Sequence, residues 1–400
     1  MSGHSVGDVA KEAGVDEGFV DRLVSLGAIP SAEDGTFGPR DVRRVRLLHS
    51  WERAGLDPET VMGLVDQGKL SLAFLDTPVI AGPGPSSSTY EELSGEQNVP
   101  FTLARRIQEA LGFVPPRPDD RARADDERLI ELAKLFIEVG ASESSILRLF
   151  RVYANSVRRV AQAEAELFEA EIEGRLRSAG MTERQLMEFG DSFGERVLPA
   201  LEDMLLSLYR RHREHVWIEH STNHAEILLR EAGLRPHAPR EYVICFVDLT
   251  GYTRVTEERG DEAAARLAGE LASLVEDVSF RRDGRPIRWL GDGGMFLFRE
   301  SEAAIFAALE MVERAPDLGL PPTHIGIHRG PVVFQDGDVY GRTVNLASRI
   351  ASQAHAGQVL VSAEPKSDVR SDEVRFEPLG RFSLKNVAEA VELYEVTRAE

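Results

Sequence analysis

The chain has few of the features that indicate a secreted or membrane-spanning protein. Among its 400 residues Cys245 is the one cysteine, which excludes an intrachain disulfide framework and a cysteine-based metal site. No apolar run approaches the roughly 18 residues that span a bilayer, and no signal peptide is visible. These absences predict a cytoplasmic protein that does not insert into membranes.

Positive charge is also scarce. There are 47 Lys and Arg against 67 Asp and Glu, which gives a formal net charge of −20. A field of this sign repels nucleic acid and anionic membranes, and at long range also nucleotides, so a site for an anionic substrate needs local cations. The length allows two or three domains, and a hydrophobic content of 42% is ordinary for a globular protein.

Two aspartates in glycine-bearing turns are the most informative residues present. Asp248 lies in the segment FVDLTGYT and Asp292 in RWLGDGG. Residues 242–246 and 287–290 predict strands, so both carboxylates are expected at strand ends. Two carboxylates brought together there can hold two Mg²⁺ ions, and the glycines allow backbone N–H groups to approach a triphosphate.

A third motif, DVYGRTVNLASR, spans residues 338–349. Asn345 and Arg349 are four residues apart in an amphipathic run, so a helix would place them on one face. Arginine suits a phosphoryl group because its planar fork can donate two hydrogen bonds to neighbouring oxygens. This motif therefore predicts a helix that contacts a phosphorylated ligand.

With these three motifs in this order, residues 240–398 resemble the catalytic domain of class III nucleotidyl cyclases. The resemblance implies an α/β sandwich with a ferredoxin-like core over residues 236–400, so the chain as a whole is predicted to be α+β with an all-α regulatory half. It implies an adenylate cyclase that converts ATP to cyclic AMP and pyrophosphate, with two Mg²⁺ or Mn²⁺ ions. The ribose 3′-oxygen would attack the α-phosphorus at an active site shared across a homodimer.

The resemblance also implies a role for each matching residue. Asp248 and Asp292 match the metal-binding aspartates, and Leu249 matches the position whose carbonyl reaches a metal. The substrate-binding positions are Gly251, Tyr252 and Thr253 at the phosphates, Arg288 and Asp338 at the purine, and Lys385 near the triphosphate. Asn345 and Arg349 match the pair that orients the ribose and stabilises the transition state. The resemblance implies that one subunit contributes the two aspartates and the other contributes the purine-reading residues, Asn345 and Arg349.

Two positions depart from the family pattern. Arg288 replaces the Lys of adenylyl cyclases, but with Asp338 it still forms a donor–acceptor pair suited to adenine. The Glu and Cys of guanylyl cyclases are absent, which favours ATP and leaves GTP as an alternative. Asn386 replaces the Gly of the family's Leu-Lys-Gly segment, so a merely solvated Lys385 is the competing interpretation.

A second alternative for the function of the whole chain is a transcription regulator whose cyclase-like domain only senses nucleotide.

The front half contains an internal repeat. Residues 1–80 resemble a MerR-type helix-turn-helix module, with helices expected to end at Gly14 and near Gly55 and to begin at Asp16 and Asp57. The pattern recurs in residues 89–155, after a predicted flexible linker at 81–88. The pairs offset by 85 are Gly27 and Gly112, Pro30 and Pro115, Asp41 and Asp126, Trp51 and Phe136, and Gly55 and Gly140, while Asn98 replaces Gly14. Acidic residues Asp16, Glu17 and Asp21 argue against DNA binding despite arginines between 40 and 53.

Residues 156–235 predict long helices and a junction. An apolar stripe there is either helical core or a dimer interface; it comprises Val197, Leu198, Leu201, Met204, Leu205 and Leu208. The arrangement is similar to mycobacterial adenylyl cyclases with a helical autoinhibitory domain. His212, His215, His220, His224 and His237 cluster at the junction. Three interpretations are open: the histidines are solvated, they sense pH, or His220 and His224 bind a metal. The sequence does not identify the effector of the front half.

Overall fold

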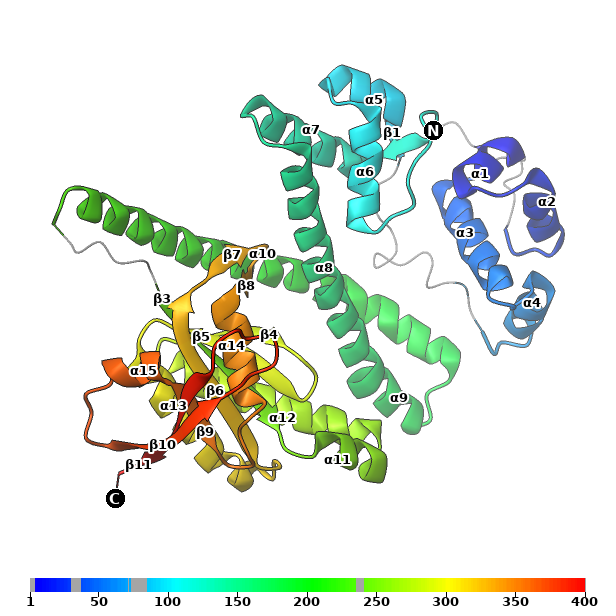
Figure 1. Ribbon diagram of the computed structural model, residues 1–400. Helices are drawn as coiled ribbons and strands as arrows, with labels where there is room; N and C mark the ends of the chain where they lie inside the picture. The colour runs from blue at the N-terminus through cyan, green and yellow to red at the C-terminus, as the bar shows by residue number, and fades with distance from the viewer. Residues whose placement is uncertain (1–3, 30–36, 71, 73–84, 235–240, 400) are drawn as a thin grey trace. The chain divides into compact units, whose positions relative to one another are not determined.

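The computed structural model of the protein describes residues 4–29, 37–70, 72, 85–234 and 241–399 (Figure 1). Internal contacts divide the chain into two units, Met1–Ala225 and Glu226–Glu400. Within the described residues, no helix combines the length and the apolar character needed to cross a membrane.

The described residues of the first unit are helical apart from one antiparallel ribbon and an isolated bridge between His4 and Phe37, and its last helix continues into the second unit. It opens with α1 (Val6–Ala13), α2 (Glu17–Ser25), α3 (Pro39–Arg53) and α4 (Pro58–Asp66). Next come β1 (Pro85–Thr89), α5 (Tyr90–Gln97), α6 (Phe101–Leu111), β2 (Arg121–Arg123), α7 (Ala124–Glu138) and α8 (Glu143–Leu167). A π-helical turn η2 (Phe168–Glu173) leads to α9 (Gly174–Ser178), and the 49-residue α10 (Glu183–Glu231) follows.

The two front modules share their capping chemistry as well as their helix order. Helices α3 and α7 are both 15 residues long, and each has an aspartate that accepts from the backbone N–H three residues earlier. Asp41 accepts from Gly38 at 2.7 Å, and Asp126 from Arg123 at 2.9 Å. Asn98, with φ of 53°, adopts the left-handed conformation that Gly14 adopts at the end of α1. The predicted helix starts are confirmed, because the Asp16 and Asp57 side chains cap α2 and α4.

Three details differ from the prediction for the front half. Residues 85–88, assigned to the linker, belong to β1, which pairs with β2 and makes this half not purely α-helical. A serine-rich composition suggested flexibility, whereas pairing with a segment more than 30 residues away orders the backbone. The long helices expected over residues 156–235 include a π-helical turn, η2, that was not predicted. Residues 81–84 and Pro30 lie outside the described residues.

The second unit is built on a seven-stranded sheet. Its elements are β3 (Glu241–Leu249), α11 (Tyr252–Arg259), α12 (Asp261–Phe280), β4 (Arg285–Trp289), β5 (Gly293–Phe298), α13 (Ser301–Arg314), η3 (Pro316–Leu318) and β6 (Thr323–Pro331). They continue as β7 (Val333–Gln335), β8 (Asp338–Tyr340), α14 (Arg342–Ala351), β9 (Val359–Ser362), α15 (Ala363–Asp368), β10 (Val374–Phe382) and β11 (Val391–Arg398). The strand order is β10-β11-β9-β6-β3-β5-β4, and the succession β3-α12-β4-β5-α13-β6 is the βαββαβ of a ferredoxin-like fold.

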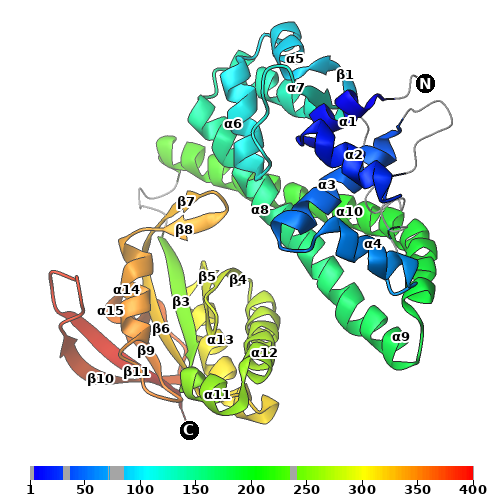
Figure 2. The same cartoon turned by 90° about the vertical axis from the view of Figure 1, so that its right-hand side faces the viewer.

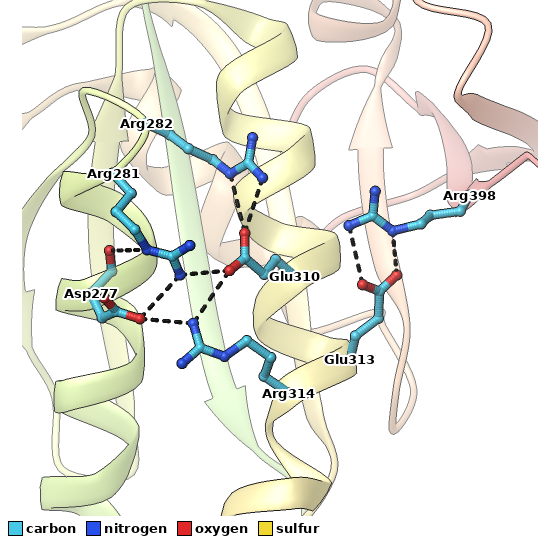
Figure 3. A network of polar contacts seen from close by, with 7 residues as sticks. All are labelled: Asp277, Arg281, Arg282, Glu310, Glu313, Arg314 and Arg398. Carbon is cyan, nitrogen blue, oxygen red and sulfur yellow. Dashed lines mark hydrogen bonds and ion pairs between the residues drawn. The ribbon is translucent and has the colours of Figure 1, made fainter.

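Both faces of this sheet are covered (Figure 2). Val243, Cys245 and Val247 pack into the cluster beneath α12 and α13, while Tyr242 and Ile244 belong to the cluster that includes residues of α14. This burial on both faces explains why residues 242–247 of β3 are apolar in succession rather than alternating. On the outer side, α12 and α13 are joined by an ionic network around Glu310 (Figure 3).

Candidate active site

The sheet brings Asp248 and Asp292 to one end of β3. Asp248 is the penultimate residue of β3, and Asp292 immediately precedes β5. The antiparallel register pairs Asp248 with Gly293, and the Leu249 N–H donates to the Asp292 carbonyl at 3.1 Å. A Cβ on Gly293 would lie 2.7 Å from the Val247 carbonyl oxygen and 3.0 Å from Asp248 Oδ1. Only glycine therefore allows the two turns to approach this closely.

The electrostatics of this pair favour a bound cation. Burial, together with the neighbouring charge of Asp292, raises the pKa of Asp248 to about 6. Its Oδ1 accepts one backbone hydrogen bond, from Leu249 at 3.2 Å. In the described part of the chain, no group of three or more His, Cys, Asp and Glu could hold a metal. The two aspartates therefore fit Mg²⁺ or Mn²⁺ only if the Leu249 carbonyl, water or substrate oxygens complete the ligand set, as is usual for Mg²⁺.

The predicted phosphate turn lies at the beginning of α11. Gly251 has φ of 77° and is the N-cap of this helix, so the first backbone N–H groups of α11 point toward the turn. The Tyr252 side chain packs against the core, whereas Thr253 is exposed. The Tyr252 ring is therefore a packing group, and its backbone N–H is what remains for a phosphate.

The two residues predicted to read the purine are in direct contact. Arg288 on β4 donates from Nε to Asp338 Oδ2 at 3.0 Å, and a second guanidinium nitrogen bonds the same oxygen. The Arg288 guanidinium also lies over the Tyr340 ring, 5.6 Å from its centroid. Asp338 Oδ1 accepts from the Val339 N–H at 2.7 Å. The pair is thus preassembled, and a base would have to share or displace its ion pair.

The remaining predicted residues gather around α14. Asn345 is exposed and Arg349 half-buried on this helix, whose Leu346 and Ile350 form a buried cluster with Leu384. Lys385 follows Leu384 in the loop between β10 and β11 and is exposed. The strand register puts this loop at the opposite end of the sheet from Asp248, with three strands between β10 and β3. One chain therefore carries two separate groups of predicted site residues.

The sequence analysis missed one residue at the aspartate turn. His324, on β6, is paired in register with Asp248 and is 14% exposed. Burial lowers the pKa of this imidazole, although the charge of Asp292 opposes the shift. The only available signal was a histidine at the start of an apolar strand, and its partner lies on a strand 76 residues away.

Comparison with known families separates the chain into two parts. Residues 237–397 match the family model described as the adenylate and guanylate cyclase catalytic domain. The C-terminal part is therefore similar to class III cyclase catalytic domains over almost its whole length. Residues 65–216 match the model described as the adenylate cyclase regulatory domain. The predicted α+β architecture and the cyclase enzyme class are confirmed, whereas the MerR resemblance of residues 1–80 stays a prediction.

Curated relatives extend over most of the chain. One is a pH-sensitive adenylate cyclase of Mycobacterium tuberculosis, 26% identical over 403 residues, which cover 97% of this chain and 93% of the relative. Another is an adenylate cyclase of Streptomyces coelicolor, 28% identical over 76% of this chain and 77% of the relative. Among solved structures, the adenylyl cyclase CyaB from P. aeruginosa is 24% identical, covers 40% of this chain and 95% of its own, and has a TM-score of 0.37.

The junction histidines lie on the surface of α10. His212, His215, His220 and His224 are exposed, and the His220 ring makes an edge contact with Trp217 at 5.4 Å between centroids. No third metal ligand joins His220 and His224 among the residues that the structure describes. His237 lies outside those residues. Solvation, pH sensing and metal binding by His220 and His224 therefore stay the three interpretations of this cluster.

Proposed function

We propose that the protein converts ATP to 3′,5′-cyclic AMP and pyrophosphate at an active site shared between two copies of the chain. The observation that carries this proposal is the pair Asp248 and Asp292, set together at the end of β3 with few donors of their own. Incubation of the purified chain with ATP and Mg²⁺ or Mn²⁺, followed by separation of the products, tests it. A chain that binds ATP but never releases pyrophosphate would favour the nucleotide-sensing alternative.

Each group of residues has a distinct task in this reaction. Asp248 and Asp292 would hold the divalent ions, which lower the pKa of the ribose hydroxyl and neutralise the triphosphate. The N-terminus of α11 offers backbone N–H groups to the phosphates. Arg349 would donate to the oxygens of the α-phosphate as charge develops there, and Asn345 would hold the ribose.

The separation of the two residue groups supports a shared site. Within the described residues, neither Asn345 nor Arg349 makes a hydrogen bond or ion pair with Asp248 or Asp292. In a dimer, the aspartates of one copy would meet Arg349, Asn345 and Lys385 of the other. Mixing Asp248→Ala chains with Arg349→Ala chains should therefore restore activity in the mixed dimer, because one intact site remains. Continued inactivity of well-formed mixed dimers would contradict the shared site.

The preference for ATP rests on the pair Arg288 and Asp338. Arg288 offers N–H donors and Asp338 offers an acceptor, which together suit the N1 and N6 edge of adenine. Comparison of cyclic AMP and cyclic GMP formation at equal substrate concentrations tests this preference. Faster cyclic GMP formation would overturn the assignment.

The helical part is proposed to gate the cyclase in response to pH. Support comes from the regulatory-domain match, the exposed histidines of α10 and the near full-length similarity to a relative named as pH-sensitive. Positive charge gained by histidines on mild acidification would lie beside Glu214, Glu219 and Glu226 and bias one helix arrangement. The test compares the pH profile of the wild type with that of a variant in which His212, His215, His220 and His224 are Gln. Identical profiles would exclude this switch.

DNA binding is not part of the proposal. Asp16 and Glu17 lie at the start of α2, where they would face phosphates, and Arg22 of that helix is paired with Glu52 and Glu59. The cations of this module are therefore partly neutralised by its own carboxylates.

A further inference from the structure

His324 occupies a position from which it can control the metal-binding turn. It is the second residue of β6, and the register sets it opposite Asp248 and Thr323 opposite Leu249. Its side chain is 14% exposed, so the ring is held within the fold rather than free in solvent. It is neither one of the family-matched residues nor part of the apolar core.

The imidazole faces both the carboxylate and the turn that follows it. Nδ1 lies 3.2 Å from Thr250 Oγ1, and Nε2 lies 3.8 Å from Asp248 Oδ2. The Thr250 N–H donates to the Pro322 carbonyl at 2.9 Å, so the same strand end holds this turn through its backbone as well. Oδ1 of Asp248 accepts from the Leu249 N–H at 3.2 Å, and the His324 ring is the group that faces Oδ2, beyond direct hydrogen-bond distance.

The geometry selects one tautomer of the ring. A proton on Nε2 points an N–H toward the Asp248 carboxylate and leaves Nδ1 to accept from the Thr250 hydroxyl. The other tautomer would turn a nitrogen lone pair toward the carboxylate, which is repulsive. In the favoured tautomer the ring links the carboxylate that would hold a metal to the turn that leads into α11.

We propose that His324 is a positioning residue that fixes the orientation of the Asp248 carboxylate and of the Thr250 turn for binding of a divalent cation with a nucleoside triphosphate. The inference rests on the proposed cyclase function, because it assigns metal binding to Asp248. Groups that orient metal ligands typically change metal affinity by about 10-fold to 100-fold when removed.

The test measures Mn²⁺ binding by electron paramagnetic resonance, with full-length protein and a non-hydrolysable ATP analogue. His324→Ala should weaken Mn²⁺ binding by about 10-fold to 100-fold. His324→Gln, whose amide reaches the Nε2 position, should recover most of the affinity, whereas His324→Asn, which reaches only the Nδ1 position, should not. His355→Ala controls for the loss of a neighbouring imidazole charge alone, since His355 is exposed in the loop after α14 and its charge acts on His324.

The outcomes separate this inference from the proposed function. Wild-type affinity in His324→Ala, or equal losses in the Gln and Asn variants, would overturn the role of His324. If His324→Ala does not fold, the comparison of Gln with Asn decides. The wild type and the variants could bind Mn²⁺ with the expected order of affinities in the presence of the analogue, while the wild type forms no cyclic nucleotide from ATP. That result would contradict the proposed cyclase activity and leave the positioning role of His324 in place.

Discussion

Asp248 in the catalytic domain and Asp126 in the second helical module are aspartates in opposite situations. Asp126 is 4% exposed and accepts from Tyr90 Oη at 2.5 Å, from Gln108 Nε2 at 2.6 Å and from the Arg123 N–H at 2.9 Å. Asp248 has one backbone donor, a histidine beyond hydrogen-bond distance and a like charge beside it. A carboxylate whose acceptor sites are filled by the protein holds the fold together, whereas one with open sites is available to a ligand.

The largest effect is expected at the open carboxylate. Asp248→Asn keeps the shape but removes the charge, so the cation loses a ligand and turnover should fall by about a thousandfold, which corresponds to about 4 kcal/mol. The free energy of unfolding should stay equal or rise, because repulsion with Asp292 is removed. Steady-state assays and denaturant titrations measure both quantities. A large loss of stability would show that Asp248 is as structural as Asp126.

The satisfied carboxylate should show the reverse behaviour. Asp126→Ala leaves the Tyr90 hydroxyl and the Gln108 amide without their partner in a buried site, which costs about 1–3 kcal/mol of the module's unfolding free energy. The chemistry at the catalytic domain should survive, because Asp126 belongs to the core of the helical unit. Tyr90→Phe, which removes one donor only, is the milder control with a loss of about 1 kcal/mol. If the free energy of unfolding is unchanged in both variants, Asp126 does not stabilise the module and the contrast with Asp248 is wrong.

The pH dependence of metal binding sharpens the comparison. The pKa of Asp248 is raised to about 6, so a proton competes with the cation as the pH falls through that value. The Mn²⁺ concentration for half-saturation should rise by up to about tenfold for each pH unit below 6 and stay level above 7. For the metal-free protein, stability depends on pH with the opposite sign from that of a salt-bridged carboxylate. Because the folded-state pKa of Asp248 is raised, its contribution to the free energy of unfolding falls as the pH rises from its ordinary pKa through 6. A flat affinity from pH 5 to 7 would contradict the raised pKa.

The smallest effect is expected at a satisfied carboxylate within the catalytic domain itself. Glu310 is 15% exposed and, although burial opposes its ionisation, the guanidinium groups of Arg282 and Arg281 hold its pKa below the usual range (Figure 3). Glu310→Gln should lower the free energy of unfolding by only about 1 kcal/mol, because the arginines that contact Glu310 are partly solvated. Turnover should stay unchanged. Glu313→Gln, which affects only the pair with Arg398, is the control. Loss of turnover without loss of stability would tie this network to function.

In the two front modules, helix-capping residues predicted the secondary structure better than amino-acid composition did. Asp16, Asp57, Gly14 and Asn98 were identified as helix ends from local chemistry, and the structure has them there. The strand β1 was missed because its partner β2 is distant in the chain and its own serines resemble a linker. The π-helical turn after α8 was missed because its residues keep the composition of a helix.

For the catalytic domain, the resemblance to class III cyclases implied the fold class, and the sequence by itself determined the two aspartate turns and the helix that carries Asn345 and Arg349. These features depend on local patterns of apolar residues, glycines and spacing, which are present in the chain before it folds. Only the tertiary structure decided that Arg288 closes on Asp338, that Lys385 lies at the other end of the sheet from Asp248, and that His324 faces the Asp248 carboxylate. The reason is physical: strand pairing and register bring together residues that are far apart along the chain, and no local property of either partner specifies which one it will meet.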